Sequence, residues 1–176
     1  AAMTLTGPIQ SLLIGIFSGI ASASGIISGK ALGDRQFEDA YIMSKKIFKI
    51  GVVGSIIIGI FLSAIASLYV KMFQVNYDIK HNTIYILYGF SLILFAKVSN
   101  MILGGGILRS GGNTKLVMFI DIIGTWMFGI PIGFIAAFIF RMPIYQVYFL
   151  LSLEEIIRLF ISLIVFKKRL WIRNIT

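Results

Sequence analysis

Five charged residues lie inside long apolar stretches of this sequence, where a charge is costly and marks a candidate functional site. They are Lys97, Asp121, Glu154, Glu155 and Arg158. A carboxylate in such surroundings is stable in its charged form only when a cation compensates it. A carboxylate that exchanges a metal ion, a proton and a lysine as partners could couple ion movement to a conformational change. The pattern therefore favours ion-coupled chemistry inside apolar helices.

The spacing of the last three charges predicts how they pair. Glu154 and Arg158 are four residues apart, and Glu155 and Arg158 are three apart, so each pair lies on neighbouring positions of a helix. One carboxylate can neutralise Arg158 locally, which leaves the other free to face Lys97 across the bundle. Asn100 lies about one turn along from Lys97 on the same helix face.

The charged residues also lie at overlapping depths. Counted at about 1.5 Å per residue from the nearest charge at the basic side, Lys97 and Glu155 lie about 18 Å deep, Arg158 about 14 Å and Asp121 about 9 Å. Our hypothesis is that Lys97, one of the two glutamates and Asp121 line a polar cavity, with Asn100 beside them. A static charge network that only holds helices in register stays open as the alternative.

The elements that position these charges are predicted to be membrane-spanning helices. The 176 residues are 58% hydrophobic with a mean hydropathy of +0.95, well above the usage of soluble domains. Runs of about 20 apolar residues cross a bilayer as helices. The sequence therefore predicts an all-α, polytopic integral membrane protein with spans near 4–29, 47–70, 83–106, 116–140 and 144–166, followed by a tail at 167–176.

Lysine and arginine predict the orientation of these spans. Five crossings place the two termini on opposite sides. One side holds eleven basic residues, Lys30, Arg35, Lys45, Lys46, Lys49, Arg109, Lys115, Lys167, Lys168, Arg169 and Arg173, and the other holds three, Lys71, Lys80 and Arg141. Basic residues accumulate on the cytoplasmic side, so we expect a multi-pass protein of the cell (plasma or inner) membrane with a cytoplasmic C-terminus. Trp171 is expected in an interfacial belt.

The glycine-rich stretch "GGGILRSGGNTK" is predicted to be a turn between two helices. Its glycines, Gly111 and Gly112 among them, would end one span and permit positive φ, while Arg109 and Lys115 would lie at the level of the headgroups. A structural role and a gating role both stay open for this turn. Pro131 lies inside a predicted span and should bend it, because it removes a backbone hydrogen bond.

Several functional classes lack the residues they need. The glycine-rich turn has no Lys-Ser/Thr pair after its second glycine, as a P-loop requires. The chain has no cysteine, one histidine and no catalytic spacing, so we expect no enzyme and no cofactor beyond a coupling ion, Na⁺ or H⁺. The net charge of +9 does not indicate a nucleic-acid partner, because the basic residues sit between the spans.

Three segments together resemble one transporter family. "GIFSGIASASGIISGKALGDRQFEDAY", "ILRSGGNTK" leading into "FIDIIGTWMFGIPIGF", and "LSLEEIIRLFISLIVFKKRLWIRNIT" are similar to the C-terminal half of multidrug and toxin extrusion (MATE) transporters. Members of that family have twelve helices in two six-helix lobes. The resemblance implies that these five helices are the eighth to the twelfth, so the first lobe and the opening helix of the second are missing partners. The chain is then expected to be partial.

The resemblance implies a secondary antiporter that exports organic cations or amphipathic drugs in exchange for Na⁺ or H⁺ by alternating access in the lipid bilayer. Aromatic residues that could offer cation–π surface to such compounds are Phe128, Phe134, Tyr145, Tyr148 and Phe149. The family carries coupling carboxylates in either lobe, so the resemblance does not decide whether these glutamates couple. The alternatives are a flippase of the related polysaccharide or lipid-linked oligosaccharide exporters, and a five-helix accessory subunit.

Overall fold

The computed structural model describes residues 2–172, and these residues form helices joined by short turns. The first half consists of α1 (Ala2–Gly33), α2 (Phe37–Lys71), and α3 (Tyr77–Asn100), which continues without a break into the π-helical η1 (Met101–Leu108). The next stretch is also continuous and comprises α4 (Thr114–Ile122), η2 (Ile123–Gly129), α5 (Ile130–Phe134) and η3 (Ile135–Ile139). The last elements are α6 (Ile144–Ser152) and α7 (Glu154–Lys167).

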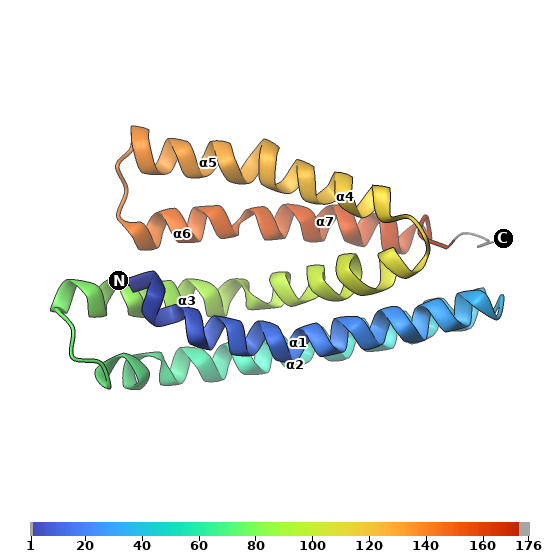
Figure 1. The fold of residues 1–176 in the computed structure, drawn as a ribbon, viewed down its shortest axis with the longest axis horizontal. Helices are drawn as coiled ribbons and strands as arrows, with labels where there is room; N and C mark the ends of the chain where they lie inside the picture. Colours follow the sequence, from blue (N-terminus) through green and yellow to red (C-terminus); the bar gives the residue numbers. More distant parts are fainter. Residues whose placement is uncertain (1, 173–176) are drawn as a thin grey trace.

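Four helical stretches of the described chain are long and apolar enough to cross a membrane, and they are Ala2–Gly33, Phe37–Lys71, Tyr77–Leu108 and Thr114–Ile139. The predicted fifth span is divided between α6 and α7, which are separated only at Leu153. Leu153 keeps helical backbone angles, φ −64° and ψ −22°, so the two helices follow one path (Figure 1). The predicted class, an all-α multi-pass membrane protein, is confirmed.

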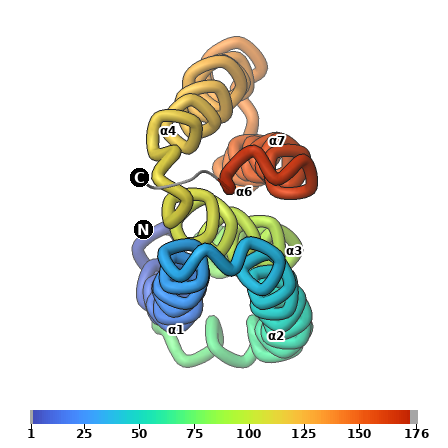
Figure 2. Tube along the Cα trace, turned by 90° about the vertical axis from the view of Figure 1, so that its right-hand side faces the viewer, coloured from blue at the N-terminus to red at the C-terminus, as the bar shows by residue number. Residues whose placement is uncertain are grey.

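The helical stretches run up and down between two ends of an elongated bundle (Figure 1). We call one the basic end. It holds the connections at 34–36 and 109–113 and the end of α7. The opposite end holds the connections at 72–76 and 140–143. Figure 2 shows α3 between the α1–α2 pair and α7, with α4 on the side of α3 away from that pair. Because α3 contacts α1, α2, α6 and α7, it supplies more of the buried core than any other helix, including Ile86, Leu87, Phe90 and Leu94.

The glycines at 104–106 do not end the third span, so that prediction is wrong. They lie inside η1, and the helix continues past Leu108. An added Cβ on Gly106 would collide with the Ser24 hydroxyl, and one on Gly25 would lie 3.3 Å from the Cα of Gly106. These two glycines therefore let the backbones of α1 and η1 approach closely. Close packing of this kind matters in lipid, because no hydrophobic effect drives apolar helices together there. Positive φ occurs only later, at Gly112 (77°) among the described glycines.

Pro131 disturbs the regular α-helix, and the disturbance takes the form of a π-helical stretch. The amide of Ile130 donates to the carbonyl of Thr125, five residues back. Proline has no N–H to donate, and its ring crowds the carbonyl four residues earlier, which belongs to Met127. Wider π-helical turns are a known response to such crowding. The predicted disturbance at Pro131 is thus absorbed by η2, directly before it.

Trp171 is not in an interfacial belt, so that prediction is also wrong. Its side chain has 0% exposure, because the chain turns back after α7 at Arg169, which has φ 55°. The indole ring stacks on Phe166 at 5.9 Å between centroids. The backbone of Trp171 lies so close to Gly111 that a side chain there would collide with it. The predicted tail therefore begins as packed structure up to residue 172, and 173–176 lie outside the described residues.

Candidate functional site

Glu155 is held from two sides by residues of α3. The Asn100 side-chain amide donates to the Glu155 Oε2 at 2.8 Å and also to its backbone carbonyl at 2.7 Å. The Lys97 Nζ lies 3.9 Å from Oε1 of the same carboxylate. Lys97 and Asn100 are three residues apart on one face of α3, so a single helix supplies both contacts. The Glu155 side chain is only 13% exposed, which makes these contacts its main compensation.

Arg158 connects α7 to α4 and η2. Its guanidinium donates to Oε1 of Glu154 at 3.0 Å and to the hydroxyl of Thr125. The same guanidinium lies 3.7 Å from Oδ1 of Asp121. The Arg158 Nε is buried without a partner in the described chain. Arg158 therefore holds two carboxylates from different helices, and one of them, Asp121, is 54% exposed.

The structure brings close together the six residues that the sequence offered as candidates for ion coupling or for the cavity. We call them the charge cluster: Lys97, Asn100, Asp121, Glu154, Glu155 and Arg158. The division between the glutamates is now visible, because Glu154 pairs with Arg158 and Glu155 lies beside Lys97. With every member ionised, two cations face three carboxylates, a formal balance of −1. Among the residues that the structure describes, no three His, Cys, Asp or Glu side chains gather as a metal site.

A cavity of about 310 Å³ opens beside the charge cluster. Its polar lining comes from five of the six cluster residues and from Arg109, and its apolar lining includes Ile14 of α1 and Gly104 and Gly105 of η1. A space of this size holds several waters or a small ion with its hydration shell. The carboxylate of Glu155 therefore lies between the Lys97 ammonium and an open volume.

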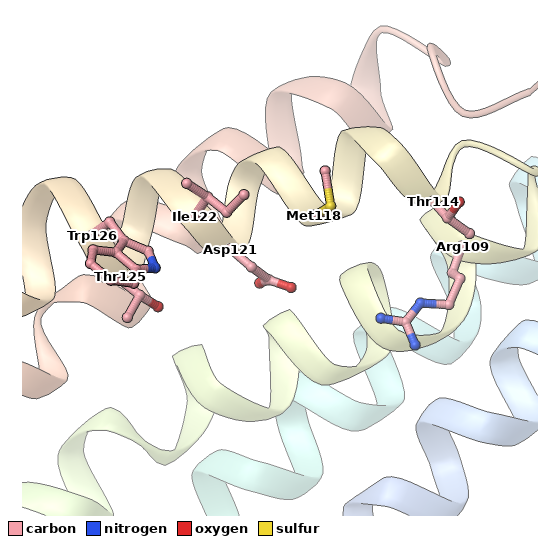
Figure 3. Close-up of a pocket in the computed structure, with 7 residues that line it drawn as sticks. All are labelled: Arg109, Thr114, Met118, Asp121, Ile122, Thr125 and Trp126. Atoms are coloured by element: carbon pink, nitrogen blue, oxygen red, sulfur yellow. The ribbon is translucent and has the colours of Figure 1, made fainter.

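A second cavity, of about 480 Å³, extends along α4 towards the basic end. Figure 3 shows its lining residues, with the side chains of Asp121 and Arg109 pointing into the space between α4 and η1. Thr125 and Trp126 lie at the deeper end, and Thr114 at the basic end. Since Asp121 and Arg109 line both cavities, the two form a polar path from the basic end to the charge cluster.

Sequence reasoning missed three residues that shape this site, Gly124, Thr125 and Gly129. An added Cβ on Gly124 would lie 2.5 Å from the Arg158 side chain, and one on Gly129 would overlap the Glu154 carboxylate. Thr125 accepts a hydrogen bond from Arg158. Their spacing of five residues, with Thr125 between, matches the π-helical η2. A search for residues on one face of an α-helix cannot find this five-residue spacing.

The predicted gating residues lie at the basic end, apart from Pro131. Arg109 ends the last turn before the glycines and is exposed, and Lys115 is exposed in the first turn of α4. Gly112 has the positive φ that the turn needs, and Gly111 leaves room for Trp171. Asn113 precedes α4 at the N-cap position and makes no side-chain capping hydrogen bond. A gating role for these residues stays a prediction.

Comparison with known proteins gives one consistent relationship. The profile of the family described as MatE matches residues 1–135. A probable multidrug resistance protein NorM from Haemophilus ducreyi is 27% identical over 135 residues, which cover 73% of this chain. The chain spans 27% of the length of that relative. The family match covers most of the chain, including α1 to α5 and the glycine-rich turn. The chain therefore belongs to the MatE family, whose members are multidrug and toxin extrusion transporters.

Proposed function

We propose that this chain is part of a secondary active antiporter that exports organic cations or other amphipathic compounds in exchange for Na⁺ or H⁺. Membership of the MatE family and the similarity to a probable multidrug resistance protein support export. The chain spans 27% of that relative, so the missing first lobe and the opening helix of the second would come from outside the given sequence.

The charge balance of the cluster is the observation that carries the proposal. Within the cluster three carboxylates face two cations, and two of these carboxylates, Asp121 and Glu155, line an open cavity that the Arg109 guanidinium also lines. Charged groups at membrane depth need compensation. One bound Na⁺ or one proton would bring the formal balance of the cluster to zero. The site is therefore suited to take up one monovalent cation at a time.

Glu155 is the carboxylate best placed to exchange partners. Glu154 has a hydrogen-bonded arginine at 3.0 Å, whereas the Lys97 ammonium is 3.9 Å from Glu155, beyond hydrogen-bonding distance. A cation or proton on Glu155 would release Lys97, which would weaken the contact between α3 and α7. Two conformations with different affinities for the ion would then be populated in turn. Alternating access of the whole transporter would follow from that shift.

In this proposal the basic end lies on the cytoplasmic side of the cell membrane, because basic residues between spans accumulate on that side. The polar path lined by Arg109 and Asp121 would then open to the cytoplasm, where an exported compound starts. Asp121 is half-exposed in that path, and it would be the first carboxylate that an organic cation meets.

A flippase for pyrophosphate-linked lipids receives less support from the site. Such a substrate needs a cationic surface that is free to bind phosphate. Lys97 and Arg158 both lie beside carboxylates, and Arg109 is the one cation lining these cavities that forms no ion pair within the described residues. The cluster as a whole is formally anionic, which favours a cationic ligand.

The test is ion-dependent transport in proteoliposomes that contain the full-length parent protein. Glu155→Gln, Glu154→Gln and Asp121→Asn are each assayed for substrate efflux driven by an imposed Na⁺ gradient or pH gradient. We expect Glu155→Gln to lower the ion-driven component at least tenfold. Asp78→Asn is the matched control, because Asp78 lies in the first turn of α3, far along the helix from Lys97.

Unchanged ion dependence in all three variants, with normal amounts of folded protein, would overturn the proposal. The charge cluster would then be a static network that holds α3, α4 and α7 together. Loss of both folding and transport in Glu154→Gln alone would assign Glu154 to structure and leave Glu155 as the coupling residue.

A further inference from the structure

The helix α2 is longer than a bilayer is thick, and its charges mark where it leaves the hydrocarbon core. Its 35 residues make a helix of about 52 Å, whereas the core is about 30 Å thick. The stretch from Ile50 to Val70 carries no charge and is about 31 Å long, with Lys49 before it and Lys71 after it. We therefore place Lys49 where the core meets the headgroups on the basic side.

Two further lysines lie just beyond Lys49. Lys45 and Lys46 are about 5 Å further along the helix axis, which is within the headgroup layer. All three side chains are exposed, and none forms an ion pair with a described residue. The acids of α2, Glu38 and Asp39, are at least about 9 Å further from the core. The three lysines therefore repel one another without local compensation, and an anion at this level would relieve the repulsion.

An exposed aliphatic row continues from these lysines towards the middle of the membrane. Ile50, Val53, Ile57 and Ile60 follow Lys46 at steps of three and four residues, which keeps them on one face of the helix. Their exposure ranges from 48% to 67%. We call the three lysines together with these four residues the α2 stripe. It presents cations at the level of the headgroups and aliphatic surface below them.

The end of α7 adds cations at the same level. The ring of Phe166 lies 5.1 Å from that of Tyr41 and 6.4 Å from that of Phe48, measured between centroids. The residues that follow it, Lys167 and Lys168, are exposed and form no ion pair within the part of the chain that the structure describes. Figure 2 shows α2 and α7 on the same side of the bundle. The positive charge beside the α2 stripe therefore comes from two helices.

A phospholipid with a net negative headgroup matches both parts of the α2 stripe. Lysine ammonium groups attract its phosphate, and the aliphatic row contacts its acyl chains. A zwitterionic lipid brings its own ammonium group, which the lysines repel. A soluble anion would leave the aliphatic row unused, and a protein partner would have to bury three lysine charges.

We propose that the α2 stripe is a binding site for an anionic phospholipid, such as phosphatidylglycerol. The headgroup phosphate contacts Lys45, Lys46 and Lys49, and the acyl chains lie along the aliphatic row. This inference is independent of the proposed export, because the binding needs neither a substrate nor a coupling ion. A lipid bound here holds the start of α2 at a fixed depth. The contact between Phe48 and Phe166 extends that constraint to the end of α7.

The test measures lipid at the α2 stripe itself, with the full-length parent protein reconstituted into bilayers. A bimane fluorophore on Val53→Cys reports nearby acyl chains, because brominated chains quench it. This chain contains no cysteine, and any cysteine elsewhere in the parent is replaced. Quenching by brominated phosphatidylglycerol and by brominated phosphatidylcholine gives their relative association constant. We expect phosphatidylglycerol to be favoured at least about fivefold at low salt, and the preference to fall as salt is added.

Three combined variants assign the preference to the lysines. The first carries Lys45→Gln, Lys46→Gln and Lys49→Gln, and its two association constants should agree within about twofold. The second replaces the same lysines by arginine, which keeps the charges and should keep the preference. The matched control removes three cations from the opposite end and should leave the preference at Val53→Cys unchanged. It carries Lys71→Gln, Lys80→Gln and Arg141→Gln.

A second reporter position needs no substituted lysine. Bimane on Leu68→Cys, an exposed position of α2 near Lys71, should show a preference at least about threefold smaller than Val53→Cys. Equal preference at the two positions, or a preference that survives in the glutamine variant, would overturn the inference. Loss of the preference in the control variant would also overturn it, because the overall charge would then be the cause. Quenching by neither lipid at Val53→Cys would show that protein covers the α2 stripe, which would equally overturn it.

Discussion

Two arginine–carboxylate contacts connect distant parts of this chain in very different surroundings. Arg158 joins Glu154 and Asp121 within the bundle, and its side chain is 19% exposed. Arg169 joins Glu38 at the basic end, where the two side chains are 44% and 67% exposed. The Arg169 pair has the better hydrogen-bonding geometry, since both guanidinium nitrogens donate to the carboxylate. The pair with the better hydrogen-bonding geometry is therefore the more exposed of the two.

The difference teaches that the surroundings decide what each pair contributes. Water and salt screen the pair at the basic end, so its net effect on stability is small. What holds that end is the aromatic stack beneath it, in which Phe166 lies between Tyr41 at 5.1 Å and Trp171 at 5.9 Å. The guanidinium of Arg169 adds only a cation–π contact, 4.4 Å from the centroid of the Tyr41 ring. Within the bundle a charge that loses its partner has less water to replace it, so breaking the inner pair should cost more.

The largest effect is expected from Trp171→Ala, which removes the stack at the basic end. A fully buried tryptophan costs about 3 to 5 kcal/mol when truncated, through lost burial and the cavity left behind. The free energy of unfolding in detergent, measured by titration with a denaturant, checks this. A loss below about 1 kcal/mol would show that the stack does not hold the basic end.

Breaking the inner pair is expected to cost slightly less, about 3 kcal/mol for Arg158→Met, because Glu154 and Asp121 would lose their shared cation. The same unfolding measurement is made on Arg158→Met combined with Glu154→Gln. Removing the stranded charge should restore about half of the loss. If the double variant is no more stable than the single one, lost packing rather than charge explains the effect.

The glycines beside the charge cluster should be intolerant of a single methyl group. Gly124→Ala would place a Cβ 2.5 Å from the middle of the Arg158 side chain, which we expect to cost about 2 kcal/mol. Gly105→Ala is the matched control, because a Cβ at that position, also in a π-helical stretch, has nothing within 4 Å. Similar thermal stability of the two variants would contradict the close approach of η2 to α7.

The smallest effect is expected for Glu38→Gln at the basic end. The hydrogen bonds from Arg169 hold the pKa of the Glu38 carboxyl below its usual value of 4.5. A lowered pKa in the folded state means that the pair stabilises the protein above about pH 4.5, and that this contribution disappears as the pH falls through the folded-state pKa.

The midpoint of thermal unfolding therefore should differ slightly between Glu38→Gln and the original protein at pH 7, and not at all below that folded-state pKa. Asp39→Asn is the control, because Asp39 forms no ion pair with a described residue. A difference that persists unchanged at low pH would show that the charge of Glu38 is not its cause.

Two simple rules led from the sequence to the residues of the charge cluster. Helical spacing placed Glu154 and Glu155 beside Arg158, and apolar runs placed Lys97 at the same depth. The sequence did not predict η1 and η2, since α-helical periodicity assumes 3.6 residues per turn throughout. Gly124, Thr125 and Gly129 therefore gained their places at the site only when the helix widened next to Pro131.

Composition by itself determined that this chain is a bundle of membrane helices, because no soluble fold hides so much apolar surface and isolated helices satisfy their own backbone in lipid. Spacing determined which charges could meet. Only the tertiary structure decided that Trp171 is buried, that Gly106 meets α1, and that Tyr85 faces Tyr145. The physical reason is that in lipid an apolar side chain gains nothing in hydrophobic energy by facing protein, so hydropathy cannot tell a packed face from an exposed one.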